Sequence, residues 1–94
     1  MDNDIKIIRR YYRFFGRVQG VGFRFRARHY ANGYGLTGWV RNCYDGSVEM
    51  EVQGPVAMIN RLITSIRESA YIGIDDFSCK EIELCTGEYG FHTR

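Results

Sequence analysis

The chain has 94 residues, of which 45% are hydrophobic and 26% charged, and its formal net charge is +2. This length and composition fit one domain over residues 1–94 with a packed core, which excludes an intrinsically disordered chain. The charge is divided unevenly, with +6 on residues 1–47 and −4 on residues 48–94, so the first half favours an anionic ligand, either a small molecule or a nucleic acid.

The first predicted element is a strand over Ile5–Phe15. Its residues are mainly Ile, Tyr and Phe with arginines between them. Alternate positions place Ile8, Tyr12 and Phe14 on one face, interrupted only by Arg10. We therefore expect that face to pack against the core.

A glycine-rich stretch, Gly16–Gly22, follows the strand and precedes a predicted helix. Glycine permits a positive φ and lets the backbone approach a ligand, and a following helix points its free N–H groups into the same space. This favours an anion site, supported by Arg17 and Arg24 at its edges. An ordinary glycine-rich turn has the same local pattern, so the pattern alone leaves both interpretations open.

The predicted helix covers Phe23–Asn32. Its apolar stripe is formed by Phe23, Ala27, Tyr30 and Ala31, with Arg24, Arg26 and Arg28 away from that stripe. Asn32-Gly33 is a typical helix end, and we expect Gly33 to take the left-handed conformation there.

A strand over Leu36–Asn42 and a turn at Tyr44-Asp45-Gly46 come next. The strand over Ser47–Gln53 alternates cleanly, which predicts one covered face and one open face. The inward residues are Val48, Met50 and Val52, and the outward residues are Glu49, Glu51 and Gln53.

Gly54-Pro55 ends this strand, and we expect Pro55 in the first turn of a second helix. Helical spacing defines the apolar face of that helix: Val56, Ile59, Leu62, Ile63 and Ile66. A fourth strand lies within Ile72–Leu84, and the tail Tyr89–Arg94 is a candidate edge strand.

The resulting element order is βαββαβ. Two β-α-β units with right-handed crossovers predict an α+β sandwich, in which one antiparallel sheet carries both helices on one face.

Cysteine and histidine spacing gives no sign of a disulfide framework or metal site. Cys43, Cys79 and Cys85 form no C-x-x-C pair, and His29 and His92 share no ligand spacing. The start Met1–Asp4 is polar, without the apolar segment of a signal peptide, and no apolar run approaches the ~20 residues of a membrane span. We therefore expect free thiols in a reducing cytoplasm, with no metal and no membrane contact.

Three motifs carry a family resemblance. Gly16-Arg17-Val18-Gln19-Gly20-Val21-Gly22-Phe23-Arg24 is followed by Gly38-Trp39-Val40-Arg41-Asn42 and by Asp45-Gly46-Ser47-Val48-Glu49. Together they resemble the acylphosphatase family, and the resemblance extends over nearly the whole chain in length and element order. The ferredoxin-like βαββαβ sandwich of that family agrees with the predicted element order.

The resemblance implies metal-independent hydrolysis of small acyl phosphates to a carboxylate and inorganic phosphate, by a monomer that needs no cofactor or covalent phosphoenzyme. It implies that Arg24 clamps the phosphate and that Asn42 holds the attacking water. The implied phosphate-binding backbone belongs to Gly16, Arg17, Val18, Gln19, Gly20, Val21 and Gly22.

These residue types suit that chemistry. A guanidinium group is planar, permanently charged and able to bind phosphate through two parallel hydrogen bonds. An asparagine amide offers one acceptor and two donors in fixed geometry, which is enough to orient a water but not to deprotonate it. The mechanism must then rest on positioning and electrostatics.

Two other functions remain open from the residues alone. An RNA-binding ferredoxin-like module would use arginines and surface aromatics, but Glu49 and Glu51 on the predicted outer face would repel a phosphate backbone. We therefore do not expect nucleic acid as a partner. A catalytically idle domain that keeps the loop for stability is the other alternative. Domains that resemble acylphosphatase also occur inside larger hydrogenase-maturation proteins.

Overall fold

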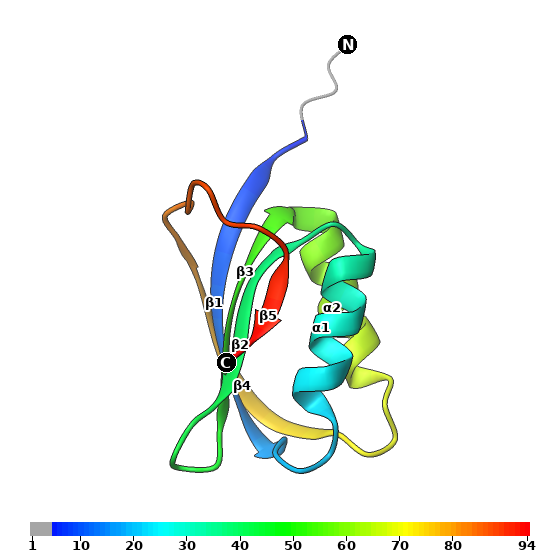
Figure 1. Cartoon of the computed structure of the whole chain (residues 1–94). Coiled ribbons are helices and arrows are strands. Elements are labelled where there is room, and N and C mark those ends of the chain that lie inside the picture. The colour runs from blue at the N-terminus through cyan, green and yellow to red at the C-terminus, as the bar shows by residue number, and fades with distance from the viewer. Residues whose placement is uncertain (1–4) are drawn as a thin grey trace.

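A computed structural model describes residues 5–94 and shows two helices packed on one face of a five-stranded sheet (Figure 1). The residues Met1–Asp4, which the sequence places in the same domain, lie outside the described part. In the sheet the strands lie in the order β4-β1-β3-β2-β5. The elements are β1 (Ile7–Arg17), α1 (Phe23–Gly33), β2 (Thr37–Asn42), β3 (Val48–Pro55), α2 (Val56–Arg67), β4 (Gly73–Ile82) and β5 (Phe91–Thr93).

The predicted α+β sandwich is confirmed, with one correction to the sheet. The pairs β1–β3, β1–β4 and β2–β3 are antiparallel, but β5 pairs with β2 in parallel, so the sheet is mixed. After β4 the chain crosses from one edge of the sheet to the other and enters β5 beside β2. Backbone bonds fix it there: the Gly38 amide donates to the Gly90 carbonyl over 3.1 Å, and the Arg94 amide to the Val40 carbonyl over 2.8 Å.

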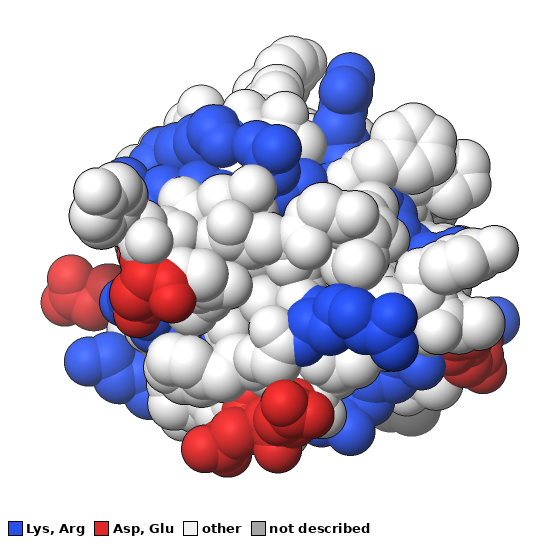
Figure 2. Space-filling view, turned by 90° about the horizontal axis from the view of Figure 1, so that it is seen from below, with Lys and Arg blue, Asp and Glu red and all other residues white. Residues whose placement is uncertain are grey.

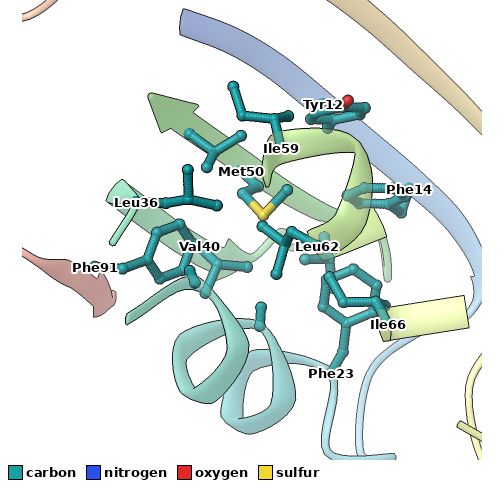
Figure 3. Close-up of a cluster of buried hydrophobic side chains, with 14 of the residues drawn as sticks. Tyr12, Phe14, Phe23, Leu36, Val40, Met50, Ile59, Leu62, Ile66 and Phe91 are labelled. Atoms are coloured by element: carbon teal, nitrogen blue, oxygen red, sulfur yellow. The ribbon is translucent and has the colours of Figure 1, made fainter. Parts of the chain in front are cut away.

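The core lies between the sheet and the helices (Figure 3). Phe14 on β1 is fully buried, and its ring lies 5.4 Å from that of Tyr12 and 5.0 Å from that of Phe23, the first residue of α1. The inward positions expected for β3 are buried too. Every residue in this set is buried: Ile8, Tyr12, Phe14, Val48, Met50, Val52, Ile59, Leu62 and Ile66. The apolar periodicity therefore selected the correct faces of these elements.

Two element ends differ from the expectation. Helix α1 continues through Gly33, and the left-handed residue is Gly35, with φ of +73°. The Leu36 amide then donates to the Ala31 carbonyl over 2.9 Å and ends the helix. The left-handed residue therefore lies two positions after Gly33, where it was predicted. Pro55 is the last residue of β3 and caps α2 rather than lying in its first turn.

The outer face of the sheet carries the charged residues of β3, as predicted, but they are paired. Glu49 is bonded by Arg41 over 3.3 Å, and Glu51 by Arg9 over 2.9 Å. Arg9 is 3% exposed although it faces outward, because the segment after β4 covers it with Glu88. Its guanidinium donates to both carboxylate oxygens of Glu88, over 2.7 and 3.1 Å. These two bonds hold the segment between β4 and β5, which crosses the sheet, against β1.

No helix within residues 5–94 is long and apolar enough to cross a membrane.

The Arg9–Glu88 pair predicts a pH-dependent stability. Burial alone would raise the pKa of Glu88, but the hydrogen bond and charge of Arg9 bring it below its ordinary value. A carboxyl whose pKa is lower in the folded state stabilises the fold above its unfolded pKa of about 4.3, and this stabilisation is lost as the pH falls below that value. We expect Glu88→Gln to lower the free energy of unfolding at pH 7 by about 1–3 kcal/mol.

Urea unfolding at pH 7 and pH 3 measures this effect. The difference in unfolding free energy between the two pH values should shrink in Glu88→Gln. The matched control is Glu81→Gln on the exposed strand β4, which removes the same charge without removing an ion pair. Equal losses in the two variants would contradict the role assigned to the pair.

Candidate active site

The turn between β1 and α1 presents a row of backbone N–H groups. We call residues 18–22 the glycine loop. Gly20 and Gly22 are left-handed, with φ of +72° and +82°, a conformation that other L-residues adopt only at a cost. The hydrogen bonds of residues 5–94 give no protein acceptor to the N–H groups of residues 18–22. Helix α1 begins directly after this loop and adds the unpaired N–H groups of its first turn and the positive end of its dipole.

A hollow of about 170 Å³ opens at this place. Arg24, in the first turn of α1, and Asn42, at the end of β2, both line it. The side chain of Asn42 has no hydrogen-bond partner within the described residues, and its amide is therefore available to a ligand or water. The full lining is Val18, Gly20, Gly22, Phe23, Arg24, Phe25 and Asn42. We call this the site hollow.

Gln19 fixes the glycine loop against the turn between β2 and β3. Its side-chain amide donates to the carbonyls of Cys43 and Ser47, each over 2.8 Å. Cys43 follows Asn42 directly, and its own amide donates to the Ser47 carbonyl over 2.8 Å. Gln19 therefore joins the loop directly to the residue after Asn42, in addition to the anchoring of the loop by the buried side chain of Val18.

The β2–β3 turn is itself held by a local network. Asp45 accepts hydrogen bonds from the amide and hydroxyl groups of Ser47, over 3.0 and 2.6 Å, and pairs with Arg13 over 3.1 Å. The bonds from Ser47, with help from Arg13, lower the pKa of the Asp45 carboxyl. Asp45 thus remains ionised at neutral pH and keeps the turn in shape.

Gly16 and Arg17 lie in β1 rather than in the hollow. A Cβ on Gly16 would lie 2.3 Å from the carbonyl oxygen of Gly73, so this glycine permits the close approach of β4. The side chain of Arg17 lies against Gly73 on the same neighbouring strand. The structure therefore separates the predicted stretch into a strand end and a loop that begins at Val18.

Arg24 is also contacted from the end of the chain. Its guanidinium donates to the backbone carbonyl of Arg94 over 3.3 Å. The Arg94 guanidinium in turn lies 4.4 Å from the centre of the Trp39 ring. Trp39 does not line the site hollow. The partner of Arg24 is thus a backbone oxygen of the last residue in the sequence, and no Asp or Glu side chain within residues 5–94 lies within 4.0 Å of the Arg24 guanidinium.

Sequence reasoning missed two features of the site. Phe25 lines the hollow with 75% of its surface exposed, and the side chain of Gln19, considered only for its backbone, connects loop and turn. Phe25 falls outside the apolar stripe of α1, and an aromatic residue on the open side of a helix was the available signal. Among residues 5–94 no group of three or more His, Cys, Asp or Glu residues is arranged to hold a metal ion.

Comparison with known proteins gives a consistent result. The family model described as acylphosphatase matches residues 10–93. The acylphosphatase of Clostridium acetobutylicum is 39% identical over 77 residues, which are 81% of this chain and 85% of that protein. The crystal structure of the Bacillus subtilis acylphosphatase superposes with a TM-score of 0.84 at 30% identity, covering 95% of this chain and 99% of that chain.

Full-length HypF in its phosphate- and nucleotide-bound form is a larger structural neighbour, with a TM-score of 0.82 at 28% identity; the match covers all of this chain and 12% of that protein. The family model extends over most of the chain, and the curated and structural relatives of similar size carry the same name. The chain therefore belongs to the acylphosphatase family, whose members are enzymes that hydrolyse acyl phosphates.

Proposed function

We propose that the site hollow binds the phosphate group of a small acyl phosphate and that Arg24 and Asn42 act on it from opposite elements. The observation that carries this proposal is their meeting in one hollow beside a loop whose N–H groups lack protein acceptors. Backbone N–H groups at a helix N-terminus suit a phosphate because they donate without adding bulk. Within the predicted stretch 16–22, the donors of this phosphate-binding loop are the backbone N–H groups of residues 18–22, because Gly16 and Arg17 end β1.

Arg24 supplies the charge of the site. Its guanidinium can bind two phosphate oxygens at once, and it is oriented by the Arg94 carbonyl. As the bond to the leaving carboxylate lengthens, negative charge on the transferred phosphoryl group is stabilised by this guanidinium and by the loop N–H groups. Arg24 therefore serves both binding and turnover.

Asn42 orients the attacking water. Its carbonyl oxygen accepts a hydrogen bond from the water, which directs the water oxygen at phosphorus, opposite the carboxylate. The water oxygen forms a new P–O bond as the P–O bond to the carboxylate breaks, and the carboxylate leaves with the bonding pair. One water proton stays on the new phosphate oxygen, and the other passes to another oxygen of the phosphate product or to solvent. A carboxylate is a weak base, so its departure needs no general acid.

The proposal extends to the setting of the enzyme. A hollow of about 170 Å³ suits a phosphate with a small acyl group, and we propose that the enzyme acts as a monomer. Cys43, Cys79 and Cys85 are free thiols, and a cytoplasmic location would keep them reduced. We take residues 1–94 as one domain. The proposed reaction requires neither a cofactor nor a nucleic acid.

Arg24→Ala should lose phosphate binding and turnover together. Removing a preorganised group that stabilises transition-state charge costs about 3–4 kcal/mol, or about 100- to 1,000-fold in rate. Steady-state hydrolysis of acetyl phosphate in EDTA measures the loss, and Arg61→Ala on α2 is the control for removal of a surface charge. Arg24→Lys should recover part of the activity, since it restores charge without the planar fork; full activity of Arg24→Ala would refute the assignment.

Asn42→Ala should lower kcat by a similar factor and leave KM within about two-fold, because the amide acts on the water and not on the bound phosphate. Inhibition by inorganic phosphate gives an independent measure of ligand binding and should be unchanged. The control is Asn60→Ala on the exposed side of α2. Near-normal kcat in Asn42→Ala would exclude the water-orienting role.

Gln19→Ala tests whether the connection between loop and turn matters for catalysis. The variant loses two hydrogen bonds, each worth about 1 kcal/mol, and a displaced loop should lower kcat/KM at least about 10-fold. Gln53→Ala is the control, because Gln53 exchanges hydrogen bonds with Cys85 and accepts one from Arg9 at the opposite end of the sheet. Gln53→Ala should lose at least as much stability in urea as Gln19→Ala, but only Gln19→Ala should lose activity; equal activities would contradict a positioning role.

A further inference from the structure

A second hollow lies along α1 next to the site hollow. It has a volume of about 340 Å³ and is lined by Phe25, Arg28, His29 and Asn32. These four residues are spaced i, i+3, i+4 and i+7, so they share one side of the helix. Phe25 lines both hollows, so the two adjoin at this side chain. We call the second one the helix groove.

The far end of the helix groove is built rigidly. Asn32 exchanges two hydrogen bonds with the backbone of Phe91: its Nδ2 donates to the carbonyl over 3.1 Å, and its Oδ1 accepts from the amide over 2.9 Å. This anchors the last turn of α1 to β5. At the near end Phe25 borders the site hollow, with its ring parallel to that of His29 at 6.4 Å between centroids.

The charge of the groove is positive and uncompensated. Helix α1 contains Arg24, Arg26 and Arg28 and no acidic residue. Within residues 5–94 the side chain of Arg28 has no hydrogen bond and no carboxylate within 4.0 Å, unlike Arg9, Arg13 and Arg41, each of which has an acidic partner. Arg26 differs as well, since it donates to the Tyr30 hydroxyl over 3.4 Å. Arg28 is thus a cation available at the groove wall.

The end of the molecule that carries the glycine loop is consistent with an anionic ligand. Figure 2 views this end and shows an uncharged central surface with basic side chains on several sides, whereas acidic side chains lie toward the margins. A ligand with two anionic groups would find a cation at each end of the path from the site hollow to the helix groove.

The spacing of the two cations restricts the ligand further. Arg24 and Arg28 are one helical turn apart, so their Cα atoms are separated by about 6 Å along the axis. An acyl phosphate with a short acyl chain that ends in a second anionic group spans a comparable distance. Acetyl phosphate ends at a methyl group and cannot reach Arg28 while its phosphate is held at Arg24.

We propose that the helix groove is the acyl-group subsite and that Arg28 selects acyl phosphates whose acyl chain ends in a second anionic group. The chain passes beside the ring of Phe25, and Arg28 binds the terminal anion. This subsite rests on the proposed phosphate site, because it has meaning only for a substrate whose phosphate lies at Arg24.

The test compares two substrates in three proteins. Monosuccinyl phosphate has a four-carbon acyl chain that ends in a carboxylate, and acetyl phosphate lacks the second anion. The wild-type chain, Arg28→Gln and Arg26→Gln are assayed in EDTA at low salt. The matched control, Arg26→Gln, removes the same charge from the same helix, at a position away from the helix groove lining.

The ratio of kcat/KM for monosuccinyl phosphate to that for acetyl phosphate is the readout. An exposed ion pair worth up to about 1 kcal/mol corresponds to about a five-fold change, so this ratio should fall about five-fold in Arg28→Gln, mainly through KM. It should stay at the wild-type value in Arg26→Gln, and Arg28→Lys should recover most of it.

An unchanged ratio in Arg28→Gln, or an equal fall in Arg26→Gln, would overturn the subsite while leaving the proposed function intact. Failure of the wild-type chain to hydrolyse either substrate would instead overturn the proposed function, and the subsite with it.

Discussion

The candidate site depends on two hydrogen bonds donated by the side-chain amide of Gln19. They join the glycine loop to the carbonyls of Cys43 and Ser47 in the β2–β3 turn. Arg24 follows the loop, and Asn42 precedes the turn, so these bonds set the relation between a residue on a helix and a residue on a strand. The contact of Arg24 with Arg94, whose amide bonds to the Val40 carbonyl of β2, is a second and longer connection between the two groups. A shift of about 1 Å is enough to impair such a site.

The glycines of the first motif have different physical purposes. Gly16 lies in β1, where a Cβ would collide with the backbone of β4. Gly20 and Gly22 lie where a Cβ would meet nothing within 4 Å, and they are required by their positive φ instead. A larger residue at Gly16 would force β1 and β4 apart, whereas a larger residue at Gly20 or Gly22 would strain the backbone of the loop. The single sequence motif therefore serves two purposes: its first glycine allows two strands to pack closely, and its later glycines shape the candidate site.

Much of the fold follows from local pattern, and the exceptions have a common cause. The strict alternation of β3 and the helical spacing of α2 gave the correct faces, because burial of one face imposes that period. Strand β5 has three residues, too few to show a period, and its parallel direction is fixed by Asn32 and Gly38, which lie far away in sequence. The same holds for Gln19, whose partners are Cys43 and Ser47. Long-range side-chain contacts leave no local signature.

Helix α1 is unusual in a way that connects stability with function. Acidic residues in a first turn stabilise a helix by about 0.3–1 kcal/mol through the dipole, yet the first turn of α1 has none and carries Arg24 instead. The glycine loop in front of it also lacks a side-chain cap. These choices cost helix stability, and they leave unpaired N–H groups and a cation at the place where the core already fixes the helix through Phe23, Ala27 and Ala31. Tertiary packing thus stabilises the helix. Its N-terminus remains open to an anionic ligand, which takes the place that an acidic side chain has in the first turn of other helices.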